Sequence, residues 1–418
     1  MKNDRHSRFS IFLIVFLPVL TAAFFYFDRV KFLGLLSFYG LLSVGRIAFQ
    51  VITAAMVSHR KYKNSWRPKV SIIVATFNED PTTYERSIRS LMQQNYPDFE
   101  VIIIDDGSDN ADSNREIAHQ LGARYYYQDN AGKREAMYNA FGQLDFDSRI
   151  VLTADSDTIW QPSAAAELVK VLLSSPEIGA VTGYVGVLNA KDNFLTRMVD
   201  QRYYMAFQQE RASQAMFGTV TCVSGPLGAY RRSVINKIKD DFISQRFMGK
   251  ACTFGDDRHL TNLVLGLGYQ VQYAPLAICL SEAPTTIRGY LKQQTRWGKS
   301  HWREMIWQWK ALPYQPFFLS YDWLLSLLMP FMLVASLASY GLALINGHAQ
   351  YLLTLIVMMV SMSLLRTLEP IRRTRNPWFL LFTIYTLFHV IVLLPLKFWA
   401  LFTMLDTRWG TRVKAEQL

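Results

Sequence analysis

Cysteine is scarce in this chain, and the distribution of its three copies excludes one class of protein. Cys222, Cys252 and Cys279 are an odd number and belong to no paired motif, so a small fold held together by disulfides is excluded. Extended disorder is excluded as well, because 50% of the residues are hydrophobic and 14% are aromatic. The 33 acidic residues are outnumbered by 44 Lys and Arg, which gives a net charge of +11. The sequence therefore describes a folded, basic protein with unpaired thiols.

Long polar segments are missing from the N-terminal end. The uncharged run 9–27 matches the ~20 residues that a helix needs to cross a membrane, and a second apolar run follows at 32–56. No small-residue cleavage site separates them, so residues 1–58 are predicted to form a transmembrane hairpin rather than a signal peptide. Basic residues flank the hairpin on both sides, and the positive-inside rule then places its two ends and the following domain in the cytoplasm. Unpaired cysteines are stable in that compartment.

The C-terminal region 317–418 is predicted to return to the membrane. Residues 317–346 are long enough for one tilted span, and 351–365 are sufficient for a short one. A basic turn over 366–375, expected in the cytoplasm, precedes the last apolar run at 379–404.

Two features leave the details of these spans open. Pro395 and Lys397 interrupt the last run, which is compatible with one span, with two short passes or with a re-entrant element. Arg46 lies near the middle of the second N-terminal run, where an arginine costs a few kcal/mol. Either this helix is long and Arg46 lies beyond the lipid, or Arg46 lines a polar path.

Residues 59–283 are predicted to form an α/β domain. Short, β-branched apolar runs alternate with helical patterns, which favours a mostly parallel, doubly wound sheet. In such sheets ligands bind at the carboxyl ends of the strands. The expected strands are 70–77, 101–105, 149–155 and 178–185, and the expected helices are 81–94, 110–121, 132–143 and 163–174.

Carboxylates gather at three of these strand ends. Asn78-Glu79 follows the first strand, Asp105-Asp106 the second and Asp155-Ser156-Asp157 the third. Like charges repel unless a cation lies among them, and two carboxylates spaced by two in an extended chain point to the same side. The third cluster therefore suits a divalent cation that holds a diphosphate, although a solvated turn is the commoner explanation of an isolated Asp-x-Asp.

Two further segments offer phosphate and sugar contacts. Lys133 and Arg134 follow Gly132 at a predicted helix start, where the helix N-terminus favours phosphate. This segment is not a P-loop, because the spacing G-x-x-x-x-G-K-[ST] is absent. Ser224-Gly225 is expected in a turn with a bare backbone that could line a sugar pocket.

Gly255-Asp256-Asp257 precedes a predicted helix over 258–266. One of the two carboxylates can act as a general base on a hydroxyl, or either can simply cap the helix. The residues do not choose between Asp256 and Asp257. His259 is not expected to bind a metal, because no second His or Cys stands at ligand spacing.

A helix over 286–310 carries an unusual face within the segment 284–316. Gln293, Arg296, Trp297 and Ser300 recur at helical spacing, where apolar residues normally stand. This face suits a diphosphate and a stacked sugar ring. The other aromatic and basic residues of the helix favour a position at the membrane surface; they are Trp302, Trp307, Trp309 and Lys310.

The motifs Asp-Asp-Gly-Ser, Asp-x-Asp, Gly-Asp-Asp and Gln-x-x-Arg-Trp, in that order and between transmembrane runs, resemble the processive family 2 glycosyltransferases. Longer strings resemble the class I hyaluronan synthases among them: SGPLGAYR at 224–231, FGDDRHLTN at 254–262, QQTRWGKSHWRE at 293–304 and WGTR at 409–412. Rhizobial chitin-oligosaccharide synthases share the layout and are similar over Gly255–Thr261. The resemblance implies a GT-A-like catalytic domain with inverting chemistry, embedded in a multi-pass α-helical membrane domain.

The resemblance also implies roles for individual residues of the donor site. The uridine would be held by Asn78, Glu79 and Asp106. Lys133 and Arg134 would meet the nucleotide or its diphosphate, with Mg²⁺ or Mn²⁺ on Asp155 and Asp157.

Further roles concern the acceptor and the closing of the site. Asp257 would be the general base, while Asp256 stays open as the alternative. Gln293, Arg296 and Trp297 would hold the diphosphate and stack the acceptor sugar. Trp409 and Arg412 would help to close the nucleotide pocket.

The leading hypothesis is a plasma-membrane polymerase that builds hyaluronan from UDP-N-acetylglucosamine and UDP-glucuronate and passes it outward. The first alternative is the same chemistry with UDP-N-acetylglucosamine alone, which gives a chitin-like chain. The second is a nucleotide-sugar-gated export channel without catalysis. The expected partners are the two UDP-sugars, the nascent polysaccharide and membrane lipids, with no nucleic acid; a monomer is left open as the working state.

Overall fold

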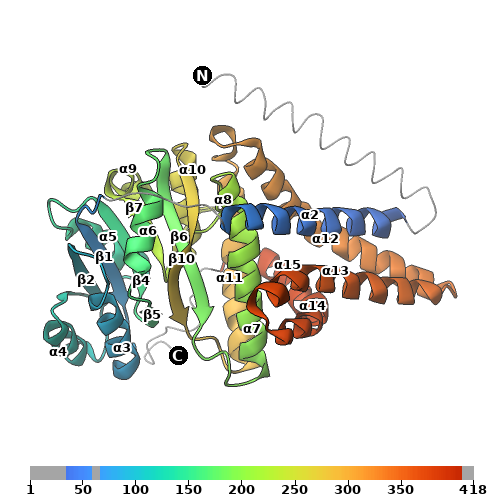
Figure 1. Cartoon of the computed structure of the whole chain (residues 1–418), viewed down its shortest axis with the longest axis horizontal. Helices are drawn as coiled ribbons and strands as arrows, with labels where there is room; N and C mark the ends of the chain where they lie inside the picture. Colours follow the sequence, from blue (N-terminus) through green and yellow to red (C-terminus); the bar gives the residue numbers. More distant parts are fainter. Residues whose placement is uncertain (1–33, 59–65, 407–418) are drawn as a thin grey trace.

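The computed structural model describes residues 34–58 and 66–406. An α/β domain forms one side of the molecule, and a group of long helices extends from the other side (Figure 1). The predicted span 9–27 and the residues Trp409 and Arg412 lie outside the described residues.

The α/β domain contains an eight-stranded sheet with the order β3-β2-β1-β4-β7-β6-β10-β5. Strands β1 to β4 are parallel. Strand β1 pairs with β2 and with β4, and β2 pairs with β3. Strands β6 and β10 are parallel to each other, whereas β7 and β5 run antiparallel to their neighbours. The bounds are β1 Val70–Thr76, β2 Phe99–Asp106, β3 Arg124–Gln128, β4 Ile150–Asp155, β5 Thr158–Trp160, β6 Ile178–Val187, β7 Gly228–Arg231 and β10 Gln270–Ser281.

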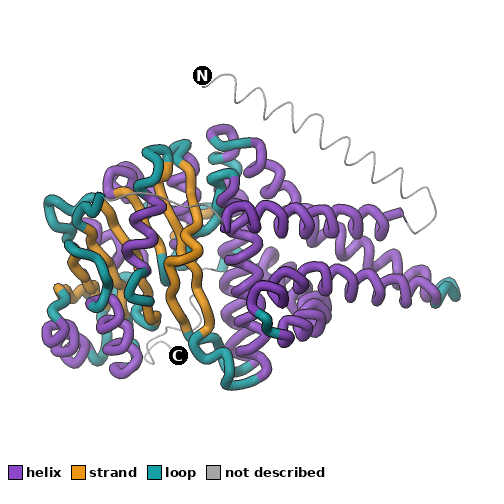
Figure 2. The backbone as a smooth tube through the Cα atoms, in the orientation of Figure 1, coloured by secondary structure: helices purple, strands orange, loops and turns teal. Residues whose placement is uncertain are grey.

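Helices cover both faces of this sheet, as Figure 2 shows. The four predicted strands and the predicted helices between them are confirmed, with ends that differ by a few residues. The helices are α3 Pro81–Met92, α4 Ala111–Leu121, α5 Lys133–Gly142, α6 Ala164–Leu172, α9 Arg232–Ile243 and α10 Asp256–Gly266, and a small hairpin is formed by β8 Arg246–Phe247 and β9 Lys250–Ala251.

The longest strand, β10, was absent from the sequence prediction. Pro275 lies within it, and its register against β6 shifts between Ala274 and Ile278. Proline normally argues against a central strand and is tolerated at bulges. The pairing partner, not the local sequence, therefore determines this strand.

The second group of elements is helical. The π-helical turn η1 continues α7 without a break, and a second π turn, η4, lies between α14 and α15. The bounds are α2 Gly34–Ser58, α7 Phe194–Tyr204, η1 Met205–Arg211, α8 Ala212–Met216, α11 Ile287–Gln308, η2 Leu312–Tyr314, α12 Phe317–Ile345, α13 Gln350–Thr374, η3 Pro377–Leu381, α14 Phe382–Phe388, η4 His389–Leu393 and α15 Leu394–Phe402.

Three helical stretches in this group are long and apolar enough to cross a membrane: Tyr39–Val57, Phe317–Ile345 and Pro377–Phe402. Large apolar side chains on them point outward, among them Leu41, Ile345 and Ile391. Exposed apolar surface on this scale is typical of contact with lipid or with another protein.

The C-terminal region differs from its prediction in one respect. The basic segment is not a turn, because α13 continues through Arg366, Arg372 and Arg373 and ends only where Arg375 adopts a left-handed conformation, with φ of 55°. The last apolar run is not divided by a loop, and its passage through a membrane stays a prediction. It is one helical run from Pro377 to Phe402, in which 3-10 and π turns interrupt the α-helical hydrogen bonding.

Arg46 has an acidic partner on another helix, and its depth in a membrane stays a prediction. Its Nη2 atom lies 2.8 Å from Asp322 Oδ1 of α12 and 3.3 Å from Ser326 Oγ. Gln214 Nε2 of α8 donates to the other oxygen of Asp322 at 2.8 Å. The arginine therefore ties α2 to α12 through a largely buried ion pair, and it does not line the cavity described below.

Breaking this ion pair should destabilise the protein. Arg46→Leu leaves the Asp322 carboxylate buried without its cation, which costs about 3–5 kcal/mol. We expect a lower thermal unfolding midpoint in detergent for Arg46→Leu, and a recovery of most of the loss in the double variant Arg46→Leu/Asp322→Leu. If the midpoint of the single variant is unchanged, the ion pair does not stabilise the protein and the charge of Arg46 is solvated by water.

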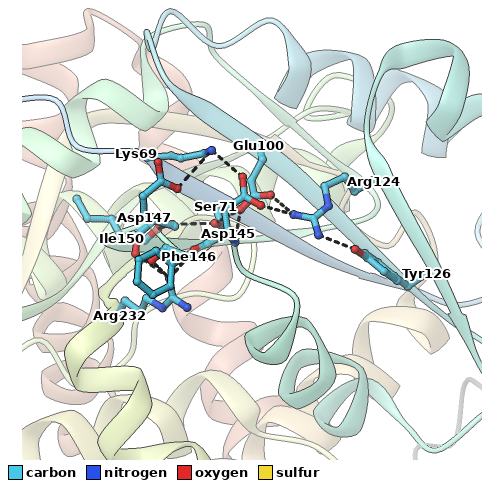
Figure 3. A network of polar contacts seen from close by, with 11 residues as sticks. Lys69, Ser71, Glu100, Arg124, Tyr126, Asp145, Phe146, Asp147, Ile150 and Arg232 are labelled. Carbon is cyan, nitrogen blue, oxygen red and sulfur yellow. Dashed lines mark hydrogen bonds and ion pairs between the residues drawn. The ribbon is translucent and has the colours of Figure 1, made fainter.

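A second polar network lies at the amino ends of β1, β2 and β3, away from the predicted functional clusters (Figure 3). Glu100 accepts hydrogen bonds from Ser71 and Arg124, and the Asp145 backbone amide donates to it at 2.9 Å. The hydrogen bond and charge of Lys69 lower the pKa of the Asp145 carboxyl. Arg232 donates to the carbonyl oxygens of the same loop, Asp145, Phe146 and Ser148. The network fixes the loop between α5 and β4, so its role is structural.

Candidate active site

A cavity of about 440 Å³ opens at the carboxyl ends of the strands and extends beneath α11. The α/β domain lines it with the end of β4 and with the loop before β7. Helices α7, η1 and α11 line the other side. The predicted site residues that line it are Lys133, Asp155, Asp157, Ser224, Asp256, Asp257, Gln293, Arg296 and Trp297.

Asp155 and Asp157 reach this cavity because the chain turns sharply where β4 ends. Asp155 is the last residue of β4, and Thr158 already begins β5. The Lys133 ammonium forms an ion pair with Asp155. Burial, and then the charges of Asp155 and Glu79, raise the pKa of Asp157 to about 7. The charges of Asp155 and Glu79 thus act on Asp157, and the charge of Lys133 partly offsets them.

These residues fit a divalent cation. Their donors are carboxylate oxygens, the ligands that Mg²⁺ and Mn²⁺ prefer, and the raised pKa of Asp157 means that a cation would relieve repulsion. Within the described residues no cluster of three or more metal-ligating side chains forms. The protein would therefore supply one or two carboxylates, and the phosphates of a substrate would complete the coordination, as is usual for Mg²⁺.

Asp106 holds a loop instead of facing the cavity. Its carboxylate accepts hydrogen bonds from the backbone amides of Ala131 and Gly132, at 2.9 and 2.8 Å, and from the Gln128 side chain at 2.8 Å. Gly107 lets the two loops meet, because its φ is +81° and an added Cβ would lie 2.7 Å from the Asn130 nitrogen. This position supports a role in shaping the loop that presents Lys133, not direct contact with a nucleoside.

Asn78 and Glu79 also lie outside the cavity lining, at the end of β1. The Asn78 side chain exchanges two hydrogen bonds with Asp109, at 2.9 and 2.7 Å, and its own φ is 49°. Glu79 accepts from Ser156 Oγ at 3.0 Å. Asn78 is exposed, so its contact with uridine stays a prediction.

Asp256, in the cavity wall, forms a buried ion pair with Arg134 behind it. Arg134 Nε lies 2.8 Å from Asp256 Oδ1, and Arg134 Nη1 donates to Gln245 at 2.7 Å. Both side chains are at least nine-tenths buried, and Arg134 is absent from the cavity lining. Arg134 is therefore not placed to touch a diphosphate, and the charge of Asp256 is already neutralised by Arg134.

Asp257 is the carboxylate of this motif that remains available. It is half-buried and lines the cavity. Cys222 Sγ lies 3.3 Å from its Oδ2 atom, and burial raises the pKa of that thiol to about 11, so the thiol stays protonated and donates. Neither aspartate is the N-cap of α10, because the helix begins at Asp256 and Gly255 is its N-cap. Within the first turn, Asp257 Oδ1 accepts a hydrogen bond from the Arg258 amide at 2.8 Å. Gly255 is needed there, since its φ is +94° and a Cβ would lie 2.2 Å from Ser300 Oγ.

The polar face predicted for the helix over 286–310 is confirmed on α11. Gln293, Arg296, Trp297 and Ser300 all line the cavity. Trp297 is 40% exposed there, and its ring centroid lies 6.3 Å from that of Tyr203. On the opposite side of α11 two of the tryptophans pack inside the protein, and the position of this helix at a membrane surface stays a prediction. Trp302 is buried and donates to Lys397 O at 2.8 Å, and the Trp307 ring packs edge-on against His259.

A further wall of the cavity comes from α7 and η1, which sequence reasoning missed. Arg202, Tyr203, Glu210 and Arg211 line it. The π turn places residues of one helical run on a face that a regular helical period does not predict, and π turns are frequent at functional sites. The detectable signal was the concentration of charges in a segment that otherwise has the apolar spacing of a buried helix.

Comparison with known proteins decides the family. Residues 68–300 match the family model described as glycosyltransferase like family 2. The chain belongs to glycosyltransferase family 2. It is 32% identical to hyaluronan synthase 3 of Xenopus laevis over 85% of this chain and 71% of that protein. It is 30% identical to hyaluronan synthase 2 of Homo sapiens over 89% of this chain and 76% of that protein.

The fold agrees with this family. A mannosyltransferase from Pyrobaculum calidifontis, solved in complex with GDP-Man and Mn²⁺, superposes with a TM-score of 0.60 at 19% identity, over 90% of this chain and 99% of that one. At this identity the likeness shows the fold alone, and it confirms the GT-A-like α/β domain. As a family 2 glycosyltransferase the protein is an enzyme, so the alternative of a channel without catalysis is wrong.

Proposed function

We propose that this family 2 glycosyltransferase polymerises hyaluronan from UDP-N-acetylglucosamine and UDP-glucuronate and passes the chain across the plasma membrane. The proposal rests on one observation: Asp155, Asp157 and Asp257 line the same cavity as Gln293, Arg296 and Trp297 of α11. The identity of 30–32% to hyaluronan synthases over most of the chain supports the choice of product.

In this proposal the donor binds at the end of the cavity formed by β4, α5 and the Ser224-Gly225 turn. Lys133 holds the diphosphate, and the N-terminus of α5 adds a favourable backbone field. Gly225 leaves room for the donor beside Asp155, because the Cβ of any other residue at this position would lie 3.3 Å from Asp155 Oδ1. A divalent cation on Asp155 and Asp157 would neutralise the leaving diphosphate.

The acceptor sugar enters from the α11 side. Its ring stacks on Trp297, which is exposed within the cavity, and Gln293 and Arg296 orient the phosphates. Asp257 accepts the proton of the attacking hydroxyl. The hydroxyl oxygen bonds to the anomeric carbon of the donor with inversion, the bond from that carbon to the phosphate oxygen breaks, and UDP leaves. The Cys222 thiol and the backbone amide of Arg258 hold the two Asp257 oxygens in place.

The helix group is proposed to lie in the membrane with the catalytic domain in the cytoplasm. The three apolar stretches of sufficient length and the exposed apolar side chains on them support this placement. The cavity touches α11, and α11 packs against α15 through Trp302 and Ala400. The product would therefore leave the transfer site directly beside the membrane helices.

The requirement for two donors tests this function. We expect the purified enzyme to form high-molecular-weight product only when both UDP-N-acetylglucosamine and UDP-glucuronate are supplied, with radiolabel from each incorporated in equal amounts. Either donor alone should yield only short products or free UDP. Polymer made at full rate from UDP-N-acetylglucosamine alone would contradict hyaluronan synthesis and establish the chitin-like alternative.

A further inference from the structure

The wall of the cavity nearest the helix group contains more cations than anions. Glu210 of η1 contacts the guanidinium of Arg202 of α7, with Nη1–Oε1 and Nη2–Oε2 distances of 3.2 and 3.3 Å. Glu210 also accepts a hydrogen bond from Arg366 of α13. Arg202 and Glu210 line the cavity, whereas Arg366 lies behind them. Two guanidinium groups thus share one carboxylate.

Glu210 stays ionised in this cluster. Burial would raise its pKa, but the charges of Arg202 and Arg366 outweigh burial and lower the pKa to about 2. Two permanent cations and one permanent anion leave this cluster with one positive charge, and Arg211 adds another cation to the same wall. Of the two arginines in the cluster, Arg202 is the one that lines the cavity, and 34% of its side chain is exposed, so a ligand would meet the charge of the cluster at Arg202.

The surroundings of Arg202 suit a charged sugar. Tyr203 lines the same cavity and is only half-buried, so part of its ring can meet a sugar ring. A guanidinium binds a carboxylate through two parallel N–H donors, and it does so strongly where water is largely excluded.

We propose that Arg202, with Arg366 behind it and Glu210 as its internal counter-ion, forms a subsite that binds a carboxylate of the growing polysaccharide as it leaves the transfer site. This inference rests on the proposed function, because hyaluronan brings one carboxylate per disaccharide to this wall. Glu210 weakens the attraction of Arg202 for the polymer, so that each carboxylate is held and then released as the chain advances.

The test compares a hyaluronan octasaccharide with the same octasaccharide esterified at its carboxyl groups. Binding of each probe to the full-length enzyme in detergent is measured by competition against a fluorescent octasaccharide. We expect the wild type to bind the charged probe about tenfold or more tightly than the ester. Arg202→Gln should remove this preference, and Arg366→Gln should reduce it, although Arg366 does not line the cavity.

Glu210→Gln has the opposite expected effect, which separates a subsite from a structural cluster. Without its counter-ion Arg202 should bind the charged probe more tightly, so the ratio of the two affinities rises severalfold. Arg115→Gln, the same change on the exposed face of α4, is the matched control and should leave the ratio at its wild-type value. Equal affinities of the wild type for the two probes, or a fall in both affinities together in all three cluster variants, would overturn the subsite.

A second measurement on the same enzyme sample tests the proposed function independently of the subsite. Glucuronate incorporation by the wild type is measured first. If the enzyme incorporates glucuronate but does not distinguish the two probes, the proposed function stands and the subsite is wrong. If it incorporates none, the proposed function fails, and the probe ratio alone decides whether the wall binds carboxylates.

Discussion

Asp257→Asn is expected to reduce sugar transfer by a factor of ~10² or more, the usual size of the loss when a general base is removed. The amide cannot accept the proton of the acceptor hydroxyl. It keeps the size of the carboxylate, and its one oxygen can still accept from either the Arg258 amide or the Cys222 thiol, so folding and UDP-sugar binding should change far less than transfer. Single-turnover transfer and UDP-sugar binding, measured on the same sample, separate the two effects.

Asp256→Asn is the matched control, and its defect should be of another kind. Asp256 pairs with the buried Arg134, and the loss of one partner of a buried ion pair costs about 3–5 kcal/mol. We expect a clearly lower unfolding midpoint for this variant, whereas Asp257→Asn should unfold near the wild-type temperature. Should Asp256→Asn instead keep its stability and lose only transfer, the base has been assigned to the wrong residue.

Asp157→Asn is expected to abolish turnover. A neutral amide is a poor ligand for a hard cation that bridges phosphates, and Asp157 lies in the cavity beside Asp155. Excess chelator should stop the wild-type enzyme in the same way, and added Mg²⁺ or Mn²⁺ should restore it. UDP binding measured with and without the cation gives a readout that does not depend on turnover.

Asp112→Asn serves as the control for this substitution. It makes the same chemical change on an exposed helix face, where Asp112 pairs only with Arg115. Its activity and its metal dependence should equal those of the wild type. Full activity of the wild type in excess chelator would rule out the divalent cation at Asp155 and Asp157.

Much of the fold could be predicted because its signals are local. Strands such as Val70–Thr76 and Phe99–Asp106 are short, β-branched apolar runs, and the helices between them have a clear apolar period. Strand β10 could not be predicted, because Pro275 contradicts a strand locally and only the shifted pairing with β6 accommodates it. The basic end of α13 was missed for a similar reason. Charges suggested a turn, but Glu210 of η1 stabilises Arg366 within the helix.

The site shows the same division. Asp155, Asp157, Asp257 and Trp297 were predicted as site residues, and the fold brings all four to one cavity. The sequence could not distinguish Asp256 from Asp257, since adjacent carboxylates have the same local chemistry. The distinction depends on Arg134, which is 122 residues away in the chain.

The sequence by itself determined the α/β pattern of the soluble domain, the apolar stretches and the residue types at the strand ends, because these depend on composition and on periods of two to four residues. The class of catalytic domain was implied by the resemblance of its motifs to family 2 glycosyltransferases. Only the tertiary structure decided which of these residues line one cavity and which contact other parts of the protein. It paired Asp256 in the cavity wall with the buried Arg134, held Asp106 against a neighbouring loop, paired Arg46 with Asp322, and brought Arg202 of α7 and Glu210 of the π turn to the cavity. The physical reason is that a buried charge must find a partner, and the identity of that partner is set by contacts between segments far apart in the chain.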